Sequence, residues 1–406
     1  MGVAYLRKFC VASTILACTA GVFGSAAQEN MPSSVDNSTL KYFPPLIDQI
    51  GGSCAQASYI GYMFTYEMNR LLGRDASASK DNQFSYLYTW NFINGGEDEG
   101  SLGVEGLQIA FEGGIATEAD FPSQYTSSQF KWTSGYENYL KAIHHRVKKI
   151  HFFNVLSREG VDEVRHYLWN RGEPGKTGGI VTFSSRSSGW TIETNYSGPS
   201  ETGYKALLTR LAPDGAHAMT IVGYDDLVEF NAPDGTLSKG AFIVCNTWGT
   251  YYYKHDRGRF YLPYWFWEQA DRDLGALGAD MVGTNVEYRE PQVVFRVKLD
   301  YSSRDDLAFR IGISNKASDS VPVNDYAVPI ANYQGGDYPM QGNGASSEIE
   351  FAFDFSSYAG NIDDSAEPKF FLTVCRNKRG KVYGSGKMLA FSVYDYRSDR
   401  EHPKIY

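Results

Sequence analysis

The order of hydrophobic patterns along the chain most constrains its fold. Apolar residues recur at helical spacing in several segments before residue 170, whereas short apolar or alternating runs bounded by glycine, proline and aspartate follow residue 179. Helices first and strands second predict an α+β unit of two lobes, one helical and one of antiparallel strands. A chain of 406 residues with 42% hydrophobic residues can build more than one core.

Four segments carry the helical pattern. The longest begins at Cys54, continues to Leu72 and is closed by Gly73, a residue that commonly ends helices. The other predicted helices cover residues 83–93, 103–111 and 157–169. The polar stretch 172–213 is predicted as an insertion at the edge of the β lobe.

A second change of pattern occurs at Glu290-Pro291. From there to the C-terminus, cleanly alternating runs such as VVFRVKLDY and MLAFSVYDY are separated by loops rich in Gly, Asn, Asp and Ser. This pattern predicts a separate all-β sandwich over residues 291–406. The two-lobed unit is expected over residues 44–287, preceded by a loose polar arm at residues 28–43. The sandwich contains no cluster of catalytic residue types and is a candidate for binding a protein or a surface ligand.

The first 27 residues have the pattern of a signal peptide. Arg7 and Lys8 precede a short apolar run, and Ser25-Ala26-Ala27 supplies the small residues that a signal peptidase reads. The run is too short for a comfortable membrane span. An alternative interpretation is a lipoprotein anchored at Cys18, because ILAC at residues 15–18 loosely resembles a bacterial lipobox. Both interpretations predict export to the periplasm, the cell surface or the medium.

Charge and cysteine content narrow the function further. The formal net charge is -9 and is spread along the chain, which argues against nucleic acid or an anionic membrane as partner. Outside the leader only three cysteines remain, so no disulfide framework is expected. Cys245 and Cys375 lie in apolar, strand-like runs and are expected to be small buried hydrophobes. Cys54 differs, because the glycine-rich loop Gly51-Gly52-Ser53 precedes it and a helix begins directly after the loop.

A cysteine at a helix N-terminus becomes a strong nucleophile when an imidazole lies beside it. Six of the seven histidines are expected to be solvated surface residues: His144, His145, His151, His166, His255 and His402. His217 stands instead at the start of an apolar strand, where taken alone it is as well explained by a structural role. The next strand ends in Asn246, whose amide oxygen can orient an imidazole, with Trp248 placed to shield that hydrogen bond. Cys54, His217 and Asn246 together would supply a nucleophile, a base and a group that orients the base. The sequence contains no metal-ligand spacing and no cofactor motif.

Four motifs in the same order resemble the papain family of cysteine peptidases. They are DQIGGSCAQAS at 48–58, GGIATEADFP at 113–122, AHAMTIVGYDD at 216–226, and CNTWGT at 245–250 followed by GRFYL. The resemblance implies a peptidase acting on peptides or proteins, with Cys54 as nucleophile, His217 as base and Asn246 as orienting residue. It also implies Gln49 as an oxyanion-hole donor.

By the same resemblance, Gly100 and Ser101 lie where substrate backbone pairs with the cleft wall. The departures indicate a divergent, bacterial member: Gln49 precedes Cys54 by five residues instead of six, and Ala55 and Thr247 replace the usual tryptophan and serine. A transamidase using the same thioester and a catalytically retired binding or adhesion protein are the alternatives. If the thiolate interpretation is right, Cys54 reacts with iodoacetamide at pH 5 to 6.

Overall fold

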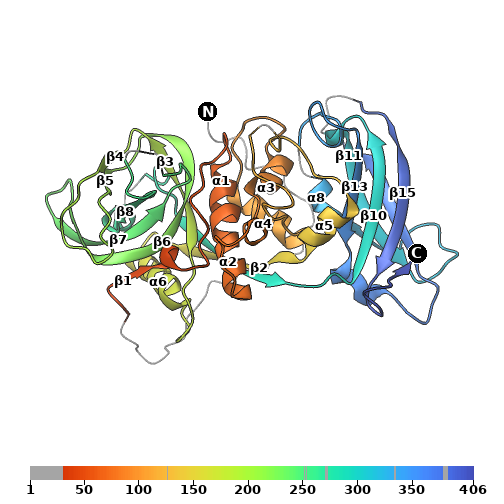
Figure 1. Cartoon of the computed structure of the whole chain (residues 1–406), viewed down its shortest axis with the longest axis horizontal. Coiled ribbons are helices and arrows are strands. Elements are labelled where there is room, and N and C mark those ends of the chain that lie inside the picture. The colour runs from red at the N-terminus through yellow and green to blue at the C-terminus, as the bar shows by residue number, and fades with distance from the viewer. Residues whose placement is uncertain are drawn as a thin grey trace.

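The structure is a computed structural model that describes residues 31–406 except 126, 251, 253, 270–272, 333–334 and 378–382. The predicted signal peptide, with Cys18, lies outside the described residues. Three parts follow one another along the molecule in Figure 1: a β lobe at the left, a group of helices in the middle, and a second β unit at the right. This arrangement confirms the α+β prediction with an additional C-terminal β unit.

A nine-stranded sheet forms the first β unit. The strands follow the order β2-β9-β3-β6-β7-β8-β5-β4, and β1 pairs with β6. They are β1 Ser34–Asp36, β2 His145–Asn154, β3 Val181–Ser188, β4 Thr191–Glu193, β5 Leu207–Arg210, β6 Asp214–Asn231, β7 Leu237–Cys245, β8 Arg259–Pro263 and β9 Asp280–Tyr288. Strand β6, which carries His217, lies inside the sheet, because it pairs with β1, β3 and β7. The predicted insertion at residues 172–213 contains strands β3, β4 and β5. Strands β4 and β5 lie at the edge of the sheet, as predicted, but β3 lies inside it.

Helices pack beside this sheet. The predicted helix from Cys54 to Leu72 is one continuous helical run of three parts: α1 Cys54–Gln56, the π-helical η2 Ala57–Phe64 and α2 Thr65–Leu72. Gly73 ends it in a left-handed conformation with φ of 69°. The remaining α-helices are α3 Tyr86–Ile93, α4 Gly103–Glu112, α5 Tyr136–Ile143, α6 Arg158–Asn170, α7 Trp265–Glu268 and α8 Pro329–Asn332. Short 3-10 turns are η1 Asn37–Thr39, η3 Lys80–Asn82, η4 Arg304–Asp306 and η5 Ser356–Asn361.

Two antiparallel sheets form the C-terminal unit, as predicted. One has the order β13-β10-β15-β16 and the other β12-β11-β14. The strands are β10 Val293–Tyr301, β11 Leu307–Ser314, β12 Asn324–Ala327, β13 Glu348–Asp354, β14 Lys369–Arg376, β15 Gly386–Asp395 and β16 Lys404–Ile405. The proposed boundary at Glu290-Pro291 falls between β9 and β10. That the two units can be separated stays a prediction.

The sandwich packs on the helices through an apolar and a charged contact. Phe351 of β13 contacts Trp132 and Tyr139, with ring centroids 6.4 and 5.2 Å apart. Beside them, the Asp354 carboxylate lies 3.0 Å from Arg146 and 2.5 Å from Arg289. Side chains of both units therefore share one continuous core.

Sequence expectations for the N-terminal arm, His145 and Cys375 are wrong. Ser34–Asp36 is a strand paired with Asp225, Tyr224 and Gly223, and buried Asn37 donates to two backbone carbonyl oxygens, so this part of the predicted loose arm is fixed to the sheet. His145 is buried, because the basic stretch around it is strand β2 with one face against Phe84. Cys375 is exposed, because β14 is the edge strand of its sheet.

Candidate active site

Cys54 begins helix α1 and is partly exposed. The helix is fixed to strand β6 by Ser58, whose hydroxyl donates to the Ala218 carbonyl oxygen at 2.9 Å. The backbone of Ala218 also lies near enough to the Cys54 thiol to act to lower its pKa. Since Ala218 directly follows His217, this contact brings the predicted nucleophile and base to the same place between the helices and the sheet.

His217 is held by two neighbours from the end of strand β7. Its Nε2 atom lies 2.7 Å from Oδ1 of Asn246, and both side chains are buried. The Trp248 ring stacks on the imidazole with centroids 4.6 Å apart and planes 27° apart. An amide oxygen accepts hydrogen bonds, so Nε2 carries the proton and Nδ1 is left free to accept one. The predicted orienting and shielding contacts are both present.

The Asn246 side chain has a fixed orientation. Its Oδ1 atom also accepts a hydrogen bond from the Thr247 backbone N–H at 2.7 Å, which distinguishes the oxygen from the nitrogen of the amide. The Asn246 carbonyl oxygen accepts a hydrogen bond from the buried Tyr62 hydroxyl at 3.1 Å. Helix and strand therefore fix the backbone and the side chain of this residue together.

Gln49 lies on a short segment that runs beside Trp248. The Gln49 backbone N–H donates to the Thr247 carbonyl oxygen at 2.8 Å, and the Thr247 hydroxyl donates to the side-chain oxygen Oε1 at 2.5 Å. The Gln49 side-chain nitrogen donates to the Gly51 carbonyl oxygen at 2.7 Å. One of its two N–H groups is thus engaged in the tight loop before Cys54.

Burial decides the charge of the two reacting groups. It raises the pKa of the Cys54 thiol, and the backbone of Ala218 opposes that rise only in part. Burial also lowers the pKa of His217 to about 4, although the hydrogen bond that His217 donates to Asn246 acts in the opposite direction. Both shifts favour the uncharged forms, a protonated thiol and an unprotonated imidazole. These shifts disfavour a preformed thiolate–imidazolium pair, and neutral His217 is suited to act as a general base. The reaction of Cys54 with iodoacetamide at pH 5 to 6 stays a prediction.

Gly100 and Ser101 lie in an exposed loop that approaches the residues before Cys54. The Asp98 carboxylate accepts a hydrogen bond from the Gly52 backbone N–H at 2.7 Å. Ser101 is held from the other side by buried Gln56, whose amide nitrogen lies 3.1 Å from its hydroxyl oxygen. The structure thus brings both predicted substrate-contacting residues next to the Cys54 loop.

Two contacts of the site were missed from the sequence. His255 was expected on the surface, but its ring stacks on Phe260 and lies near Trp248, with centroids 5.1 and 6.2 Å away. Asp98 was not singled out, since an acidic loop residue gives no sign of binding a distant backbone N–H. A signal for His255 did exist, because it follows the Asn246–Trp248 turn by only a few residues.

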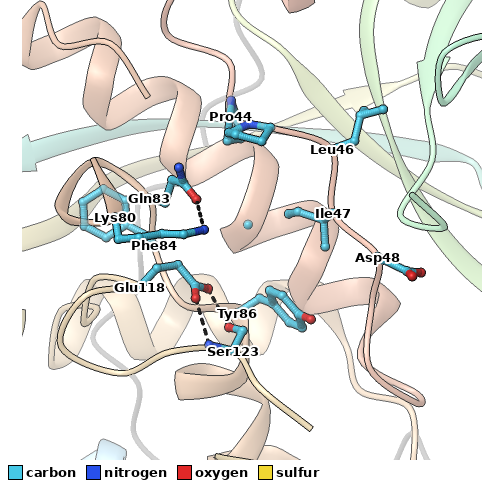
Figure 2. A pocket seen from close by; sticks show the side chains of 12 residues that line it. Pro44, Leu46, Ile47, Asp48, Lys80, Gln83, Phe84, Tyr86, Glu118 and Ser123 are labelled. Atoms are coloured by element: carbon cyan, nitrogen blue, oxygen red, sulfur yellow. Dashed lines mark hydrogen bonds between the residues drawn. The ribbon is translucent and has the colours of Figure 1, made fainter. Parts of the chain in front are cut away.

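A separate cavity of about 170 Å³ adjoins the segment that leads into Gln49 (Figure 2). Ile47, Phe84 and Tyr86 supply apolar walls, and half-buried Glu118 accepts two hydrogen bonds from Ser123. Lys80 extends along it to Gln83. The predicted site residues are not among the residues that line it.

Two further searches cover only the described ranges. No helix there is long and apolar enough to cross a membrane. In the same ranges, no group of three or more histidine, cysteine, aspartate or glutamate side chains is arranged to hold a metal ion.

Comparisons with known proteins find similarity in structure only. No family model matches the chain, and no curated protein matches its sequence. Xylellain, a cysteine protease from Xylella fastidiosa, is 17% identical over 63% of this chain and 86% of its own, with a TM-score of 0.41. The ragweed cysteine protease Amb a 11, in its proform, is 18% identical over 64% of this chain and 67% of its own, also with a TM-score of 0.41.

The bromelain protease from Ananas comosus, in complex with the E64 inhibitor, is 14% identical over 63% of this chain and 99% of its own, with a TM-score of 0.41. This chain is similar in fold to these papain-like cysteine proteases, and it has in addition the two C-terminal antiparallel sheets. Identities below 20% bear on the fold alone.

Proposed function

We propose that the chain is an exported cysteine peptidase that hydrolyses peptide bonds through a thioester at Cys54. The observation that carries the proposal is the buried hydrogen bond of 2.7 Å between His217 and Asn246, beside the helix that begins with Cys54. It fixes the imidazole tautomer in which Nδ1 can accept a proton. A purely structural histidine has no need of this arrangement next to a thiol.

The reaction follows from these positions. His217 Nδ1 takes the thiol proton as Cys54 Sγ bonds to the carbonyl carbon of the scissile peptide, and the charge passes to the carbonyl oxygen. The backbone N–H of Cys54 and the second side-chain N–H of Gln49 stabilise this oxyanion. When the C–N bond breaks, the imidazolium returns its proton to the leaving amine. His217 then deprotonates a water molecule that attacks the thioester, which releases the carboxylic acid and restores the thiol.

The decisive measurement is the site of labelling by a peptidyl epoxide, mapped by mass spectrometry. The structure provides an internal control, because Cys375 is exposed and free while Cys54 is only partly exposed. We expect alkylation at Cys54 and not at Cys375, since the reagent must be bound and activated as a substrate is. Cys375→Ala should retain full peptide cleavage. Equal labelling of both thiols, without cleavage of any peptide, would favour the catalytically retired alternative.

Export is the second part of the proposal. The basic residues, short apolar run and small residues of positions 1–27 support it. We expect N-terminal sequencing of the exported protein to begin at Gln28. Acylated Cys18 as first residue would contradict cleavage after Ala27 and would place the protein on a membrane surface.

A further inference from the structure

The loop of residues 94–102, here called the wall loop, has no helix or strand of its own. On one side it is tied to the site. Asp98 accepts the hydrogen bond from Gly52, and the Glu99 carbonyl oxygen accepts one from the Trp90 indole at 3.0 Å. A Cβ atom built on Gly52 would come within 2.9 Å of the Glu99 backbone. The wall loop therefore touches the chain two residues before Cys54.

On its other side the wall loop touches the β-sandwich. Gly96 is buried and left-handed, with φ of +77°, and a Cβ atom there would lie 2.6 Å from the Gly335 carbonyl oxygen and 2.9 Å from the Gly336 Cα atom. The contact is reciprocal, because a Cβ atom on Gly336 would lie 2.6 Å from the Gly95 carbonyl oxygen. The two backbones meet so closely that only glycine fits on either side.

The sandwich side of this contact is firmly held. Asp305 accepts hydrogen bonds from the backbone N–H groups of Gly335 and Gly336, at 3.0 and 3.1 Å. Buried Arg304 donates to the Gly335 carbonyl oxygen at 2.8 Å and to the Phe130 carbonyl oxygen of the helical part at 2.9 Å. The Arg304 guanidinium lies over the Trp132 ring, 4.6 Å from its centroid. A turn held by two charged side chains can act as a rigid support.

We infer that this turn of the β-sandwich, residues 335–338, is a positioning element for the cleft wall beside Cys54. The inference rests on the proposed peptidase function. The wall loop is exposed from Glu97 to Gly100, so its place relative to Cys54 is set by its anchors, and one of them belongs to the C-terminal unit. The sandwich then contributes to catalysis without contributing a catalytic residue.

The glycines offer matched variants in the full-length protein. Gly96→Ala and Gly336→Ala force the two backbones apart, and a shift of about 1 Å near a reacting group can lower a rate by up to about 10²-fold. We expect both to lower kcat/KM for a peptide substrate by roughly 10- to 100-fold, mostly through KM. Gly95→Ala and Gly344→Ala impose the same left-handed strain, with φ of +68° and +64°, but their Cβ atoms would meet nothing within 4 Å. They should stay within about threefold of wild type.

Two further measurements separate the outcomes. Iodoacetamide is too small to need the cleft wall, so its rate with Cys54 should be unchanged in every variant that folds. Tyr338→Ala removes the ring nearest Gly96 without introducing a clash, and it should raise KM about tenfold even if the glycine variants fail to fold. Cleavage by wild type with equal KM values for Gly96→Ala, Gly95→Ala and Tyr338→Ala would overturn the inference. No peptide cleavage by wild type would instead overturn the proposed function.

Discussion

Replacing His217 by alanine is expected to lower kcat/KM for peptide cleavage by roughly 10²–10⁴-fold, the usual contribution of a general acid–base group. The imidazole is the only predicted acceptor for the thiol proton, and burial keeps it neutral and ready to accept. The matched control is His145→Ala. His145 is equally buried, its pKa is likewise lowered to about 4 by burial, and it packs against Phe84 instead of Trp248. This control should lose stability but keep its turnover per folded molecule.

The same residue sets the expected pH dependence. Because the pKa of His217 is lowered to about 4, activity should persist through pH 5 and fall only as the imidazole is protonated near pH 4. The sign for stability follows from the same shift: an unfolded histidine takes up a proton below about 6.5, so the free energy of unfolding decreases as pH falls from there toward 4. An acid limb of kcat/KM near 6.5, or equal loss of turnover in His217→Ala and His145→Ala, would rule out this role.

Removing the Asp354 carboxylate is expected to destabilise the protein by about 3–5 kcal/mol, as is usual when one partner of a buried ion pair is lost. The side chain of Asp354 on β13 is 2% exposed, and that of its partner Arg146 on β2 is 4% exposed. Burial acts to raise the pKa of Asp354, but Arg146 and Arg289 outweigh it and hold the pKa below its ordinary value. Asp354→Ala would leave the Arg146 charge buried and without this carboxylate.

Urea unfolding of Asp354→Ala measures this effect, and Asp363→Ala is its control, since that carboxylate is exposed and bonds only within its own turn. The control should change the free energy of unfolding by less than about 0.5–1 kcal/mol. Limited proteolysis of the same variant also addresses the predicted boundary at Glu290-Pro291, because the ion pair joins the two units across it. A variant as stable as wild type would show that this ion pair contributes little to the coupling of the two units.

Local patterns were sufficient for much of the fold. The helix after Cys54, the helix at 157–169 and the five alternating runs after Pro291 were predicted because periodicity and end signals agreed there. Strand β2 was missed, because its alternation is hidden in KAIHHRVKKIH: Arg146 is buried as well as His145 and Val147, and the pairing register shifts between Val147 and Lys149. The exposure of Cys375 depends on β14 lying at a sheet edge, a matter of strand order that no local pattern encodes.

The candidate site, like the fold, could be predicted only in part from the sequence. Cys54, His217 and Asn246 could be singled out, because each lies at the end or start of an element with a polar neighbour of suitable chemistry. Their ionisation could not be predicted, since the pKa of His217 depends on burial that arises only when α1, β6 and β7 pack together. The Thr247–Gln49 hydrogen bond was likewise invisible, because it joins residues far apart in the chain.

The pairing of β1 with β6 has a consequence for the timing of synthesis. Ser34 pairs with Asp225, and the ladder between β2 and β9 closes only when Tyr288 is available. A chain that emerges from its N-terminus must therefore hold its first strand without a partner until more than half of its length has appeared, and such long-range pairings form slowly. Cys54 emerges early, but the histidine beside it arrives late. The newly made chain thus passes through a long interval in which its thiol is present and its imidazole is not, so the proposed peptidase activity would begin only when the sheet is complete.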